Sequence, residues 1–335
     1  MKKIISIFMA LVLLVCLAAC ELPSADNKTP GSPTTPDANN PATLPTEPAS
    51  EGLEFELIDS PHLKEFHETY RVSGIGTCTD TDIVIPSTYE GVPVTRIGDE
   101  AFKDCTSLTS VKIPNSVLGI SQSAFYGCRG LTSITIPASV EGIYFGAFSK
   151  CTSLTSIVFE ENSKLTGIAN EAFYGCTSLT SITIPAGVTY IGKCTFGKCE
   201  SLTSVVFEEN SQLQCIDEYG FAGCWSLTSI TIPDSVIYIY DYAFSNSSLN
   251  SVTLSASMTR IYEGTFQYNY ELTSVTIPAS VTYIEADVFL NCDNLTSINY
   301  EGTMLEWKKV TWKAGWNTVN PVKEVICSDG TVKLK

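Results

Sequence analysis

The heptapeptide CTSLTSI stands at residues 151–157 and again, unchanged, at residues 176–182, and CTSLTSV at residues 105–111 differs only in its last letter. A phrase repeated at a regular distance indicates a chain built from copies of one structural unit. The longer unit around the phrase reads CTSLTSITIPAGVTYIGKCTFGKC at residues 176–199. This repeat decides the fold class, and it raises the question of what its cysteine does.

The leucine of the phrase recurs along most of the chain at spacings of 22 to 25 residues: Leu108, Leu131, Leu154, Leu179, Leu202, Leu227, Leu249, Leu272 and Leu295. This period lies in the window of leucine-rich repeats. One unit buries too little apolar surface to offset its ordering entropy, so the units must stack. We predict a β-rich leucine-rich repeat solenoid of about nine to ten coils, with parallel β ladders, short helical turns and a cap at both ends.

Two short strands are expected in each coil. Ile182 and Ile184 alternate with Ser and Thr, the period of two that marks a half-buried strand, and a proline ends that strand. A second extended piece follows, with Val188 and Ile191 pointing inward. The last third of a unit, AF-x-x-C as in residues 172–176, is long enough for one helical turn. Each coil is therefore expected to contain two strands and a turn.

The unit resembles the repeat of the BspA-like family of bacterial surface leucine-rich repeat proteins, which reads close to C-x-S-L-T-S-I-x-I-P-x-S-V-T-x-I-G-x-x-A-F. The resemblance recurs nine times and covers residues 83–310. It implies a surface lipoprotein that binds a partner. The commoner leucine-rich repeat has an Asn or Cys nine residues into its motif, where this chain has Ser139 and Gly187. A deep horseshoe with a single binding face is therefore not expected.

An N-terminal cap is predicted over residues 51–82. Residues 53–58 and 70–75 read as its strands, and residues 83–86 read as a shortened first coil. A cap is expected because the open edge of a solenoid exposes unpaired backbone groups.

A C-terminal cap is predicted over residues 301–335, after the repeats of residues 83–300. Residues 301–310 are expected to form a helical lid. Residues 325–334 are expected to form a hairpin that turns at Asp329-Gly330. Both ends of the stack would then be covered.

The chain opens with two lysines and an apolar run that ends in small residues, the layout of a signal peptide over residues 1–19. The motif LAAC at residues 17–20 resembles the bacterial lipobox, so Cys20 is the expected lipid attachment site; the alternative is an ordinary cleaved signal with an incidental cysteine. Residues 20–50 are rich in Pro and Thr, which is typical of a disordered linker. These features predict an exported protein anchored at the bacterial cell surface or envelope by lipid alone.

The charge balance excludes some partner classes. The chain contains 20 Lys and Arg against 36 Asp and Glu, a net charge of −16. Such an acidic surface repels phosphate backbones and anionic headgroups, which argues against nucleic-acid binding and against electrostatic membrane binding. We expect a monomer whose partner is an extracellular protein or host-surface ligand.

Seven cysteines share one position in successive coils and are expected to form a column: Cys105, Cys128, Cys151, Cys176, Cys199, Cys224 and Cys292. We interpret the thiol as a small apolar core side chain. Neighbours in such a column come within disulfide range, but their parallel Cβ vectors disfavour bridging. Asn246 or Asn269 fills the position in other coils. Free buried thiols are therefore expected.

Patterns for catalysis and metal binding are sparse. His62 and His67 lie outside any metal-binding motif and are expected at the surface. Cys194 and Cys199, with Cys215 one coil further on, are the nearest approach to a metal site, yet no C-x-x-C pair occurs. We expect no metal, no cofactor and no enzymatic activity.

The two units of 25 residues carry the same insertion, EENS, at residues 160–163 and 208–211. Its acid pairs, and the pair Asp217-Glu218, would suit a glycosidase only if two carboxyl groups faced each other across a cleft. The insertions recur at one phase of the repeat. They are therefore expected to form solvated loops at one edge of the stack.

Aromatic side chains around the second strand are the best binding candidates. The outward positions there carry Tyr144, Tyr190, Tyr238, Tyr240, Arg260, Tyr262 and Tyr283. Stacked coils would align them into a ridge, and Tyr and Arg dominate protein recognition sites; β propensity alone also favours Tyr on exposed strands. Trp307, Trp312 and Trp316 suggest a sugar platform but are expected to pack on the last coil.

The leading hypothesis is a non-enzymatic cell-surface lipoprotein whose repeats form a scaffold for protein–protein interaction or adhesion. The alternative is a carbohydrate-binding surface lipoprotein that captures glycans, with a glycan hydrolase as a weaker form of that idea. A third interpretation is a passive spacer that has no specific ligand.

Overall fold

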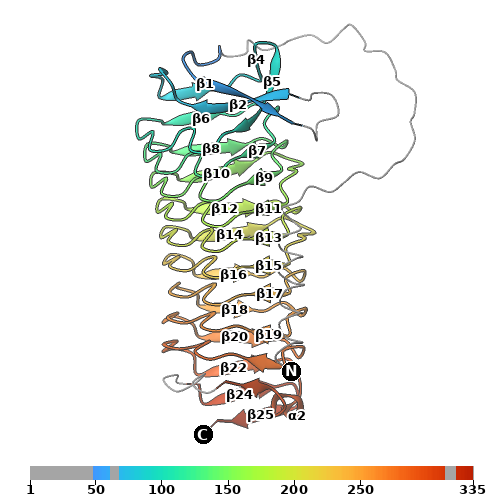
Figure 1. Ribbon diagram of the computed structural model, residues 1–335. Helices are drawn as coiled ribbons and strands as arrows, with labels where there is room; N and C mark the ends of the chain where they lie inside the picture. Colours follow the sequence, from blue (N-terminus) through green and yellow to red (C-terminus); the bar gives the residue numbers. More distant parts are fainter. Residues whose placement is uncertain (1–47, 61–67, 314–321, 335) are drawn as a thin grey trace, which may run out of the picture. The chain divides into compact units, whose positions relative to one another are not determined.

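Two short strands recur in successive turns of the chain, as predicted, and each set stacks into a column of mostly parallel strands (Figure 1). The computed structural model describes residues 48–60, 68–313 and 322–334. The first column comprises β3 (Asp82–Val84), β6 (Ser110–Lys112), β8 (Ser133–Ile136), β10 (Ser156–Phe159), β12 (Ser181–Ile184), β14 (Ser204–Phe207), β16 (Ser229–Thr231), β18 (Ser251–Thr253), β20 (Ser274–Ile277), β22 (Ser297–Tyr300) and β24 (Glu324–Cys327). The second column comprises β2 (Glu68–Gly74), β5 (Val92–Ile97), β7 (Gly119–Ile120), β9 (Gly142–Ile143), β11 (Gly167–Ile168), β13 (Tyr190–Ile191), β15 (Cys215–Ile216), β17 (Tyr238–Ile239), β19 (Arg260–Ile261), β21 (Tyr283–Ile284) and β23 (Thr311–Trp312). The unit from Ala49 onward is thus a β-solenoid of about 11 turns, slightly more than expected.

Equivalent residues of successive coils pair with each other. Ile157 of β10 pairs with Ile134 of β8, and Ile191 of β13 pairs with Ile216 of β15. Side chains alternate between the two faces of a strand, so this register places the repeated inward Ile and Val positions of successive coils on the inner face, whereas Val158 and Val206 lie on the outer face. The alternating pattern of the sequence thereby becomes one continuous apolar interior.

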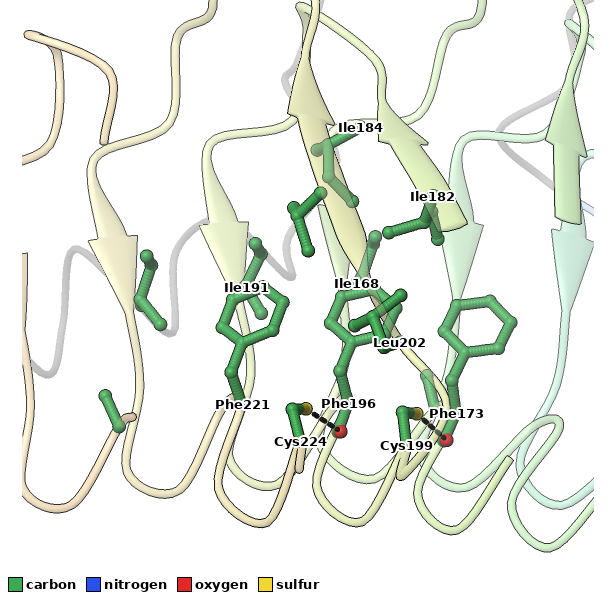
Figure 2. Close-up of a cluster of buried hydrophobic side chains, with 14 of the residues drawn as sticks. Ile168, Phe173, Ile182, Ile184, Ile191, Phe196, Cys199, Leu202, Phe221 and Cys224 are labelled. Atoms are coloured by element: carbon green, nitrogen blue, oxygen red, sulfur yellow. Dashed lines mark hydrogen bonds between the residues drawn. The ribbon is translucent and has the colours of Figure 1, made fainter. Parts of the chain in front are cut away.

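A column of phenylalanines forms the centre of the interior. Its members are all fully buried: Phe102, Phe125, Phe148, Phe173, Phe196, Phe221, Phe244, Phe266 and Phe289. Neighbouring rings lie nearly parallel, with centroids 5.0–5.9 Å apart. This spacing is close to the distance between adjacent strands in a sheet, about 4.8 Å. Figure 2 shows Phe173, Phe196 and Phe221 side by side along this column.

The segment around each of these phenylalanines is not helical, so the prediction of short helical turns was wrong. The backbone N–H of Phe125 donates to the carbonyl of Ala147 (2.7 Å), and that of Gly127 donates to Ser149 (2.8 Å). An α-helix would direct these N–H groups to its own carbonyls. Positive φ angles at Ser123 (53°) and Gly127 (71°) turn them toward the next coil instead. The segment thus forms a third hydrogen-bonded ladder along the stack.

The repeated cysteine is a hydrogen-bond donor as well as a core side chain. The Cys199 thiol donates to the carbonyl of Phe173 in the preceding coil (3.4 Å), and the Cys224 thiol donates to that of Phe196 (3.3 Å) (Figure 2). The same bond to the preceding phenylalanine is made by Cys128, Cys151, Cys176 and Cys292. Cys105, the first of the column, is half-buried and contacts the carbonyl of Lys103 (3.9 Å). All cysteines of the described segments are free thiols.

The coils without cysteine show that this position requires a donor. The Ser247 hydroxyl donates to the Phe221 carbonyl (3.2 Å), and the Asn269 amide donates to the Phe244 carbonyl (2.8 Å). The expectation that Asn246 fills the position was therefore wrong, because the slot lies three residues after the phenylalanine and belongs to Ser247. A purely apolar account of the thiol is incomplete for the same reason.

The threonine after the repeated leucine bonds along the stack too. The Thr180 hydroxyl donates to the Thr155 carbonyl (3.3 Å), and the Thr203 hydroxyl donates to the Thr180 carbonyl (3.0 Å). Four of the five letter types of CTSLTSI thus have a role in stacking. Cys and Thr bond to the preceding coil, whereas Leu and Ile fill the interior.

The two insertions are structural. The Glu160 carboxylate accepts the backbone N–H of Ala138 (3.1 Å), and the Glu208 carboxylate accepts that of Ala186 (2.9 Å). Both bonds join an inserted loop to the preceding coil. These two carboxylates therefore satisfy backbone donors rather than facing each other across a cleft.

At the N-terminal end, β1 (Glu54–Asp59) pairs antiparallel with β2, and β2 pairs parallel with β5. The region expected to be a separate cap thus supplies a strand to the second column. A short β4 (Thr88–Tyr89) pairs antiparallel with β5.

At the C-terminal end, the solenoid continues beyond residue 300 through β23 and β24. The expected hairpin is present, because β24 pairs antiparallel with β25 (Gly330–Lys333). The expected lid contains α2 (Met304–Trp307), a single helical turn and the only α-helix of the described segments. Trp307 is buried and packs edge-on against Trp312, with ring centroids 4.4 Å apart.

Several predicted features lie outside the described residues: the signal peptide, Cys20, most of the linker, His62, His67 and Trp316. Across residues 48–60, 68–313 and 322–334, no helix has the length and apolar character needed to span a bilayer.

Candidate binding surface

The outer face of the second column changes character along the stack. Side chains alternate along a strand, so the residues immediately before and after the buried Ile of each second strand point outward onto this face. In the N-terminal coils these positions are mostly small: Gly119, Ser121, Gly142, Gly167 and Ala169. In the C-terminal coils they carry large side chains: Tyr238, Tyr240, Arg260, Tyr262, Tyr283 and Glu285. The predicted ridge is therefore confined to one end of the stack.

Tyr144 does not join the other tyrosines. Its ring lies against Gly142, where a Cβ would approach the ring to 3.3 Å, and close to Gly119. The next coil has Gly167 and Ala169 at the equivalent positions and carries no aromatic side chain there. Tyr144 is 43% exposed and stands alone on a flat, glycine-rich face.

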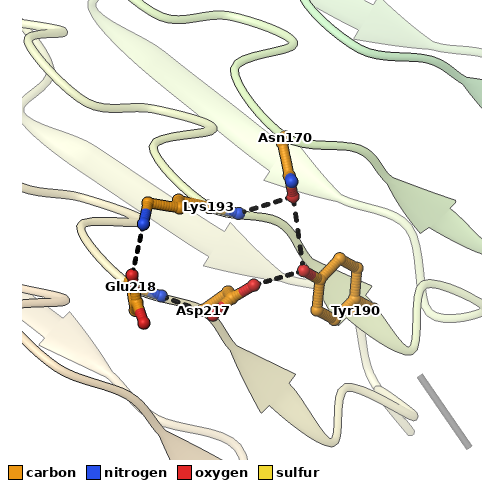
Figure 3. A network of polar contacts seen from close by, with 5 residues as sticks. All are labelled: Asn170, Tyr190, Lys193, Asp217 and Glu218. Carbon is orange, nitrogen blue, oxygen red and sulfur yellow. Dashed lines mark hydrogen bonds and ion pairs between the residues drawn. The ribbon is translucent and has the colours of Figure 1, made fainter. Parts of the chain in front are cut away.

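Tyr190 belongs to a polar network between coils (Figure 3). Its hydroxyl donates to the carboxylate of Asp217 and lies 3.4 Å from the side-chain oxygen of Asn170. The Asn170 oxygen also accepts the backbone N–H of Lys193 (2.9 Å), and the Lys193 ammonium pairs with Glu218. The pair Asp217-Glu218 is thus part of a surface network that joins three coils.

The remaining five side chains form one cluster, here called the Tyr–Arg cluster: Tyr238, Tyr240, Arg260, Tyr262 and Tyr283. Tyr238 and Tyr240 stack with centroids 5.8 Å apart, and Tyr240 meets Tyr262 at 4.9 Å in an edge-on contact. The guanidinium of Arg260 lies 5.1 Å from the ring centre of Tyr262 and 4.5 Å from that of Tyr283. Cation–π attraction holds the Arg side chain between two rings.

Glu285 anchors this arginine. The Glu285 carboxylate is only 5% exposed and forms ion pairs with Arg260 and with Lys313, the latter at 2.5 Å. Sequence reasoning missed Lys313, because the repeats were expected to end at residue 300. Thr311 and Trp312 pair with Tyr283 and Ile284 in the register of the second column. Aligning TWK at residues 311–313 with YIE at residues 283–285 would have revealed Lys313 as the equivalent of Glu285.

Burial favours the neutral form of one ring of the cluster, that of Tyr262. Burial raises the pKa of Tyr262, and the positive charge of Arg260 only partly opposes this. Burial also raises the pKa of nearby Asp241, opposed by a hydrogen bond from the backbone N–H of Glu263 (3.0 Å). The cluster therefore offers aromatic surface, hydroxyl groups and one held guanidinium, a combination suited to binding another surface.

The cysteine column has a different chemical character. Burial raises the pKa of the Cys224 and Cys292 thiols to about 12. A thiol that stays protonated is a poor nucleophile and a poor metal ligand. Within the described ranges, no three His, Cys, Asp or Glu side chains are grouped so as to hold a metal ion, and Cys194, Cys199 and Cys215 form no such group.

The fold and the repeat agree with comparisons to known proteins. The family model of the BspA type leucine rich repeat region, in six copies, matches residues 76–203 and 191–314. A solved leucine-rich repeat protein from Bacteroides ovatus ATCC 8483 is 30% identical, with a TM-score of 0.56, and the match covers 76% of this chain and 71% of that protein. A leucine rich cell surface protein from Faecalibacterium prausnitzii A2-165 is 23% identical, with a TM-score of 0.44, over 81% of this chain and 99% of that one.

No curated protein sequence matches the chain. The matched repeats nevertheless extend from residue 76 to residue 314, which is well over half of the chain. The same stretch contains most strands of both columns, the phenylalanine stack and the thiol column. On this basis the chain belongs to the BspA-type leucine-rich repeat family.

Proposed function

We propose that the protein is a non-enzymatic scaffold on the bacterial cell surface, and that the Tyr–Arg cluster binds an extracellular protein. The observation that carries the proposal is Arg260 held between two tyrosine rings and paired with buried Glu285. Tyr and Arg supply most of the energy at many protein interfaces. A side chain already held in place loses little entropy on binding, which favours affinity.

The rigidity of the solenoid supports this role. Ladders of backbone hydrogen bonds hold neighbouring coils in register, and the inward positions are occupied by the core. The outward positions can therefore differ between coils without disturbing the stack. This is the property that a display scaffold requires.

Binding to an array of extracellular-matrix and host-cell surface proteins tests the proposal. The Arg260→Ala variant and the double variant Tyr238→Ala/Tyr283→Ala should weaken every wild-type interaction by about tenfold or more. Tyr144→Ala is the matched control, since Tyr144 lies on the same face but outside the cluster. Unchanged binding in the cluster variants, or no wild-type binding above background, would remove the cluster from the account.

Anchoring at Cys20 is a separate part of the proposal. It rests on the apolar leader and the LAAC motif of residues 17–20. Wild-type cells grown with labelled palmitate should incorporate label into the protein, whereas a Cys20→Ser variant should not. Equal labelling of the two forms would contradict lipidation at this cysteine.

A further inference from the structure

Three tyrosines occupy unfavourable backbone positions on the third ladder. Tyr219, Tyr242 and Tyr268, in successive coils, have φ angles of 58°, 59° and 62°. This left-handed region disfavours bulky side chains. Tyr219 and Tyr242 lie two residues before the stacked phenylalanine of their coils, where two other coils have Gly146 and Gly264. Tyr268 lies two residues after it, where other coils have Gly127, Gly175, Gly223 and Asn291. Positive φ angles recur at both positions in coil after coil, with side chains as different as Glu171, Lys150 and Gly223, so the stack does not require aromatic rings there.

Neighbouring residues hold the first two rings in place. Tyr219 and Tyr242 stack face to face, with centroids 5.1 Å apart and an angle of 8° between the planes. The equivalent position of the next coil is Gly264, where a Cβ would collide with the Tyr242 ring. The Tyr242 hydroxyl donates to the Glu263 carboxylate (2.7 Å). The stacked pair is therefore pre-organised.

These rings line a solvent-open hollow of about 490 Å³, here called the tyrosine hollow. Its lining residues are Tyr219, Tyr242, Ser245, Asn246, Gln267, Tyr268 and Tyr270. The side chains of Tyr268 and Tyr270 are 37% and 48% exposed, with their ring centroids 6.2 Å apart. Among the described residues, none forms a hydrogen bond with the side-chain amide of Asn246 or Gln267. Aromatic surface and available amides thus occur together.

We propose that the tyrosine hollow binds an uncharged glycan chain. A hexose ring presents C–H groups on one face, which pack on aromatic rings, and hydroxyl groups at its edge. Hydroxyl groups both donate and accept hydrogen bonds, and so do the amides of Asn246 and Gln267. No side chain of the lining is charged. The Lys193 ammonium lies 6.0 Å from the ring centre of Tyr219, but it is already paired with Glu218. An anionic glycan would therefore gain little from this cation, in a chain whose net charge is −16.

The chemistry of the hollow favours a sugar over a proline-rich peptide, the other common ligand of tyrosine-lined grooves. Proline has no backbone N–H, so such a peptide offers mainly carbonyl acceptors. It would leave the acceptor oxygens of both amides unused. A glycan satisfies the donors and the acceptors together.

The hollow and the Tyr–Arg cluster consist of different residues. Asp241 and Glu263 stand between them in the chain, next to Tyr240 and Tyr262 of the cluster. The glycan proposal therefore does not depend on the proposed protein partner. Variants of the two surfaces can be tested separately.

Calorimetric titration of the full-length chain with cellohexaose, mannohexaose, xylohexaose and maltohexaose tests the proposal. At least one neutral hexasaccharide should bind with a dissociation constant below about 1 mM. Tyr268→Ala, Tyr270→Ala and Asn246→Ala should each weaken that binding by about tenfold. Tyr144→Ala and Arg260→Ala should leave it unchanged, and circular dichroism should show that all variants are folded.

Absence of binding by all four hexasaccharides would overturn the proposal, as would equal affinity in the Tyr268→Ala and Tyr270→Ala variants. Binding only of a sulfated hexasaccharide would also overturn the proposal and would indicate an anionic ligand. Binding only of a peptide that copies the proline-rich residues 30–48 of this chain would overturn it too and would indicate a peptide ligand. If Arg260→Ala loses the protein partner yet retains the hexasaccharide, the two surfaces act independently. If the hexasaccharide is lost as well, the hollow is not an independent site.

Discussion

The coil that contains Gly142 and the coil that contains Tyr238 share an interior but differ on the outside. Each has a buried Ile in its second strand and a stacked phenylalanine, Phe148 in one and Phe244 in the other. One outer face is flat and glycine-rich, whereas the other carries the Tyr–Arg cluster. Stacking therefore dictates the inner side chains and leaves the outer ones free, so a few outer positions decide what each end of the molecule can bind.

The shared interior predicts that a core substitution damages both kinds of coil. Phe196→Ala removes one fully buried ring from the column and should lower the free energy of unfolding by about 3–5 kcal/mol. Urea denaturation followed by circular dichroism measures this loss. The exposed Tyr144→Ala serves as the control, and a similar small loss in both variants would contradict a shared, closely packed core.

Alkaline pH should weaken the interior through the buried thiols. The pKa of Cys224 and of Cys292 is about 12 in the fold, because burial disfavours the thiolate, against 9.0 when exposed. Below pH 9 both states are protonated and the contribution of the thiols is complete. Between pH 9 and pH 12 only the unfolded chain loses these protons, so the free energy of unfolding falls by about 1.4 kcal/mol per pH unit for each thiol.

This pH dependence has a matched control in the chain itself. Cys224→Ser keeps a donor, as Ser247 does one coil further on, but does not titrate in this range. Urea midpoints measured across the window should therefore fall less steeply in the variant than in the wild type. Identical slopes would show that the Cys224 thiol does not titrate as described.

Two substitutions of one cysteine in the column can distinguish the contribution of packing to stability from that of hydrogen bonding. Cys199→Val keeps the volume but removes the donor to the Phe173 carbonyl, and should lower the free energy of unfolding by about 1–2 kcal/mol. Cys199→Ser retains a donor and should cost less. Thermal denaturation compares the two variants, and a more stable Val variant would restore the purely apolar interpretation.

The smallest effect on stability is expected where the two coils differ. Tyr238→Ala and Tyr144→Ala should each change the free energy of unfolding by less than about 1 kcal/mol, because both side chains lie on the outer face. Only Tyr238→Ala should weaken binding to an extracellular protein partner. Surface plasmon resonance measures partner binding by the two variants. Equal weakening of binding by both substitutions would contradict the difference between the two outer faces.

Local patterns were sufficient for the paired strands and the buried columns. Ile182 and Ile184 alternate with polar residues, and a shift of one residue would expose both, so the register follows from the sequence. The helical turn was predicted wrongly because residues such as Ser123 and Lys150 give no sign of their positive φ angles. The donor role of Cys199 was missed because its acceptor is a backbone carbonyl of another coil.

The residues that make up the two candidate binding surfaces were harder to predict from the sequence, because they depend on tertiary structure. The repeat placed Tyr238, Tyr240 and Tyr283 on one face, but it also placed Tyr144 there, which stands alone. Lys313 joined the cluster only when the last coil was seen to continue past residue 300. The tyrosine hollow was not predicted, since Tyr219 and Tyr270 belong to different positions of the repeat.

The sequence by itself determined that the chain stacks, because a single coil cannot bury its apolar residues and the repeat supplies a neighbour for each. Tertiary structure alone decided which outer side chains meet, since contacts such as that of Tyr219 with Tyr242 join residues 23 positions apart. The physical reason is that the local spacing of apolar residues shows which side chains are buried, whereas contact between exposed side chains depends on the backbone conformation of two coils at once.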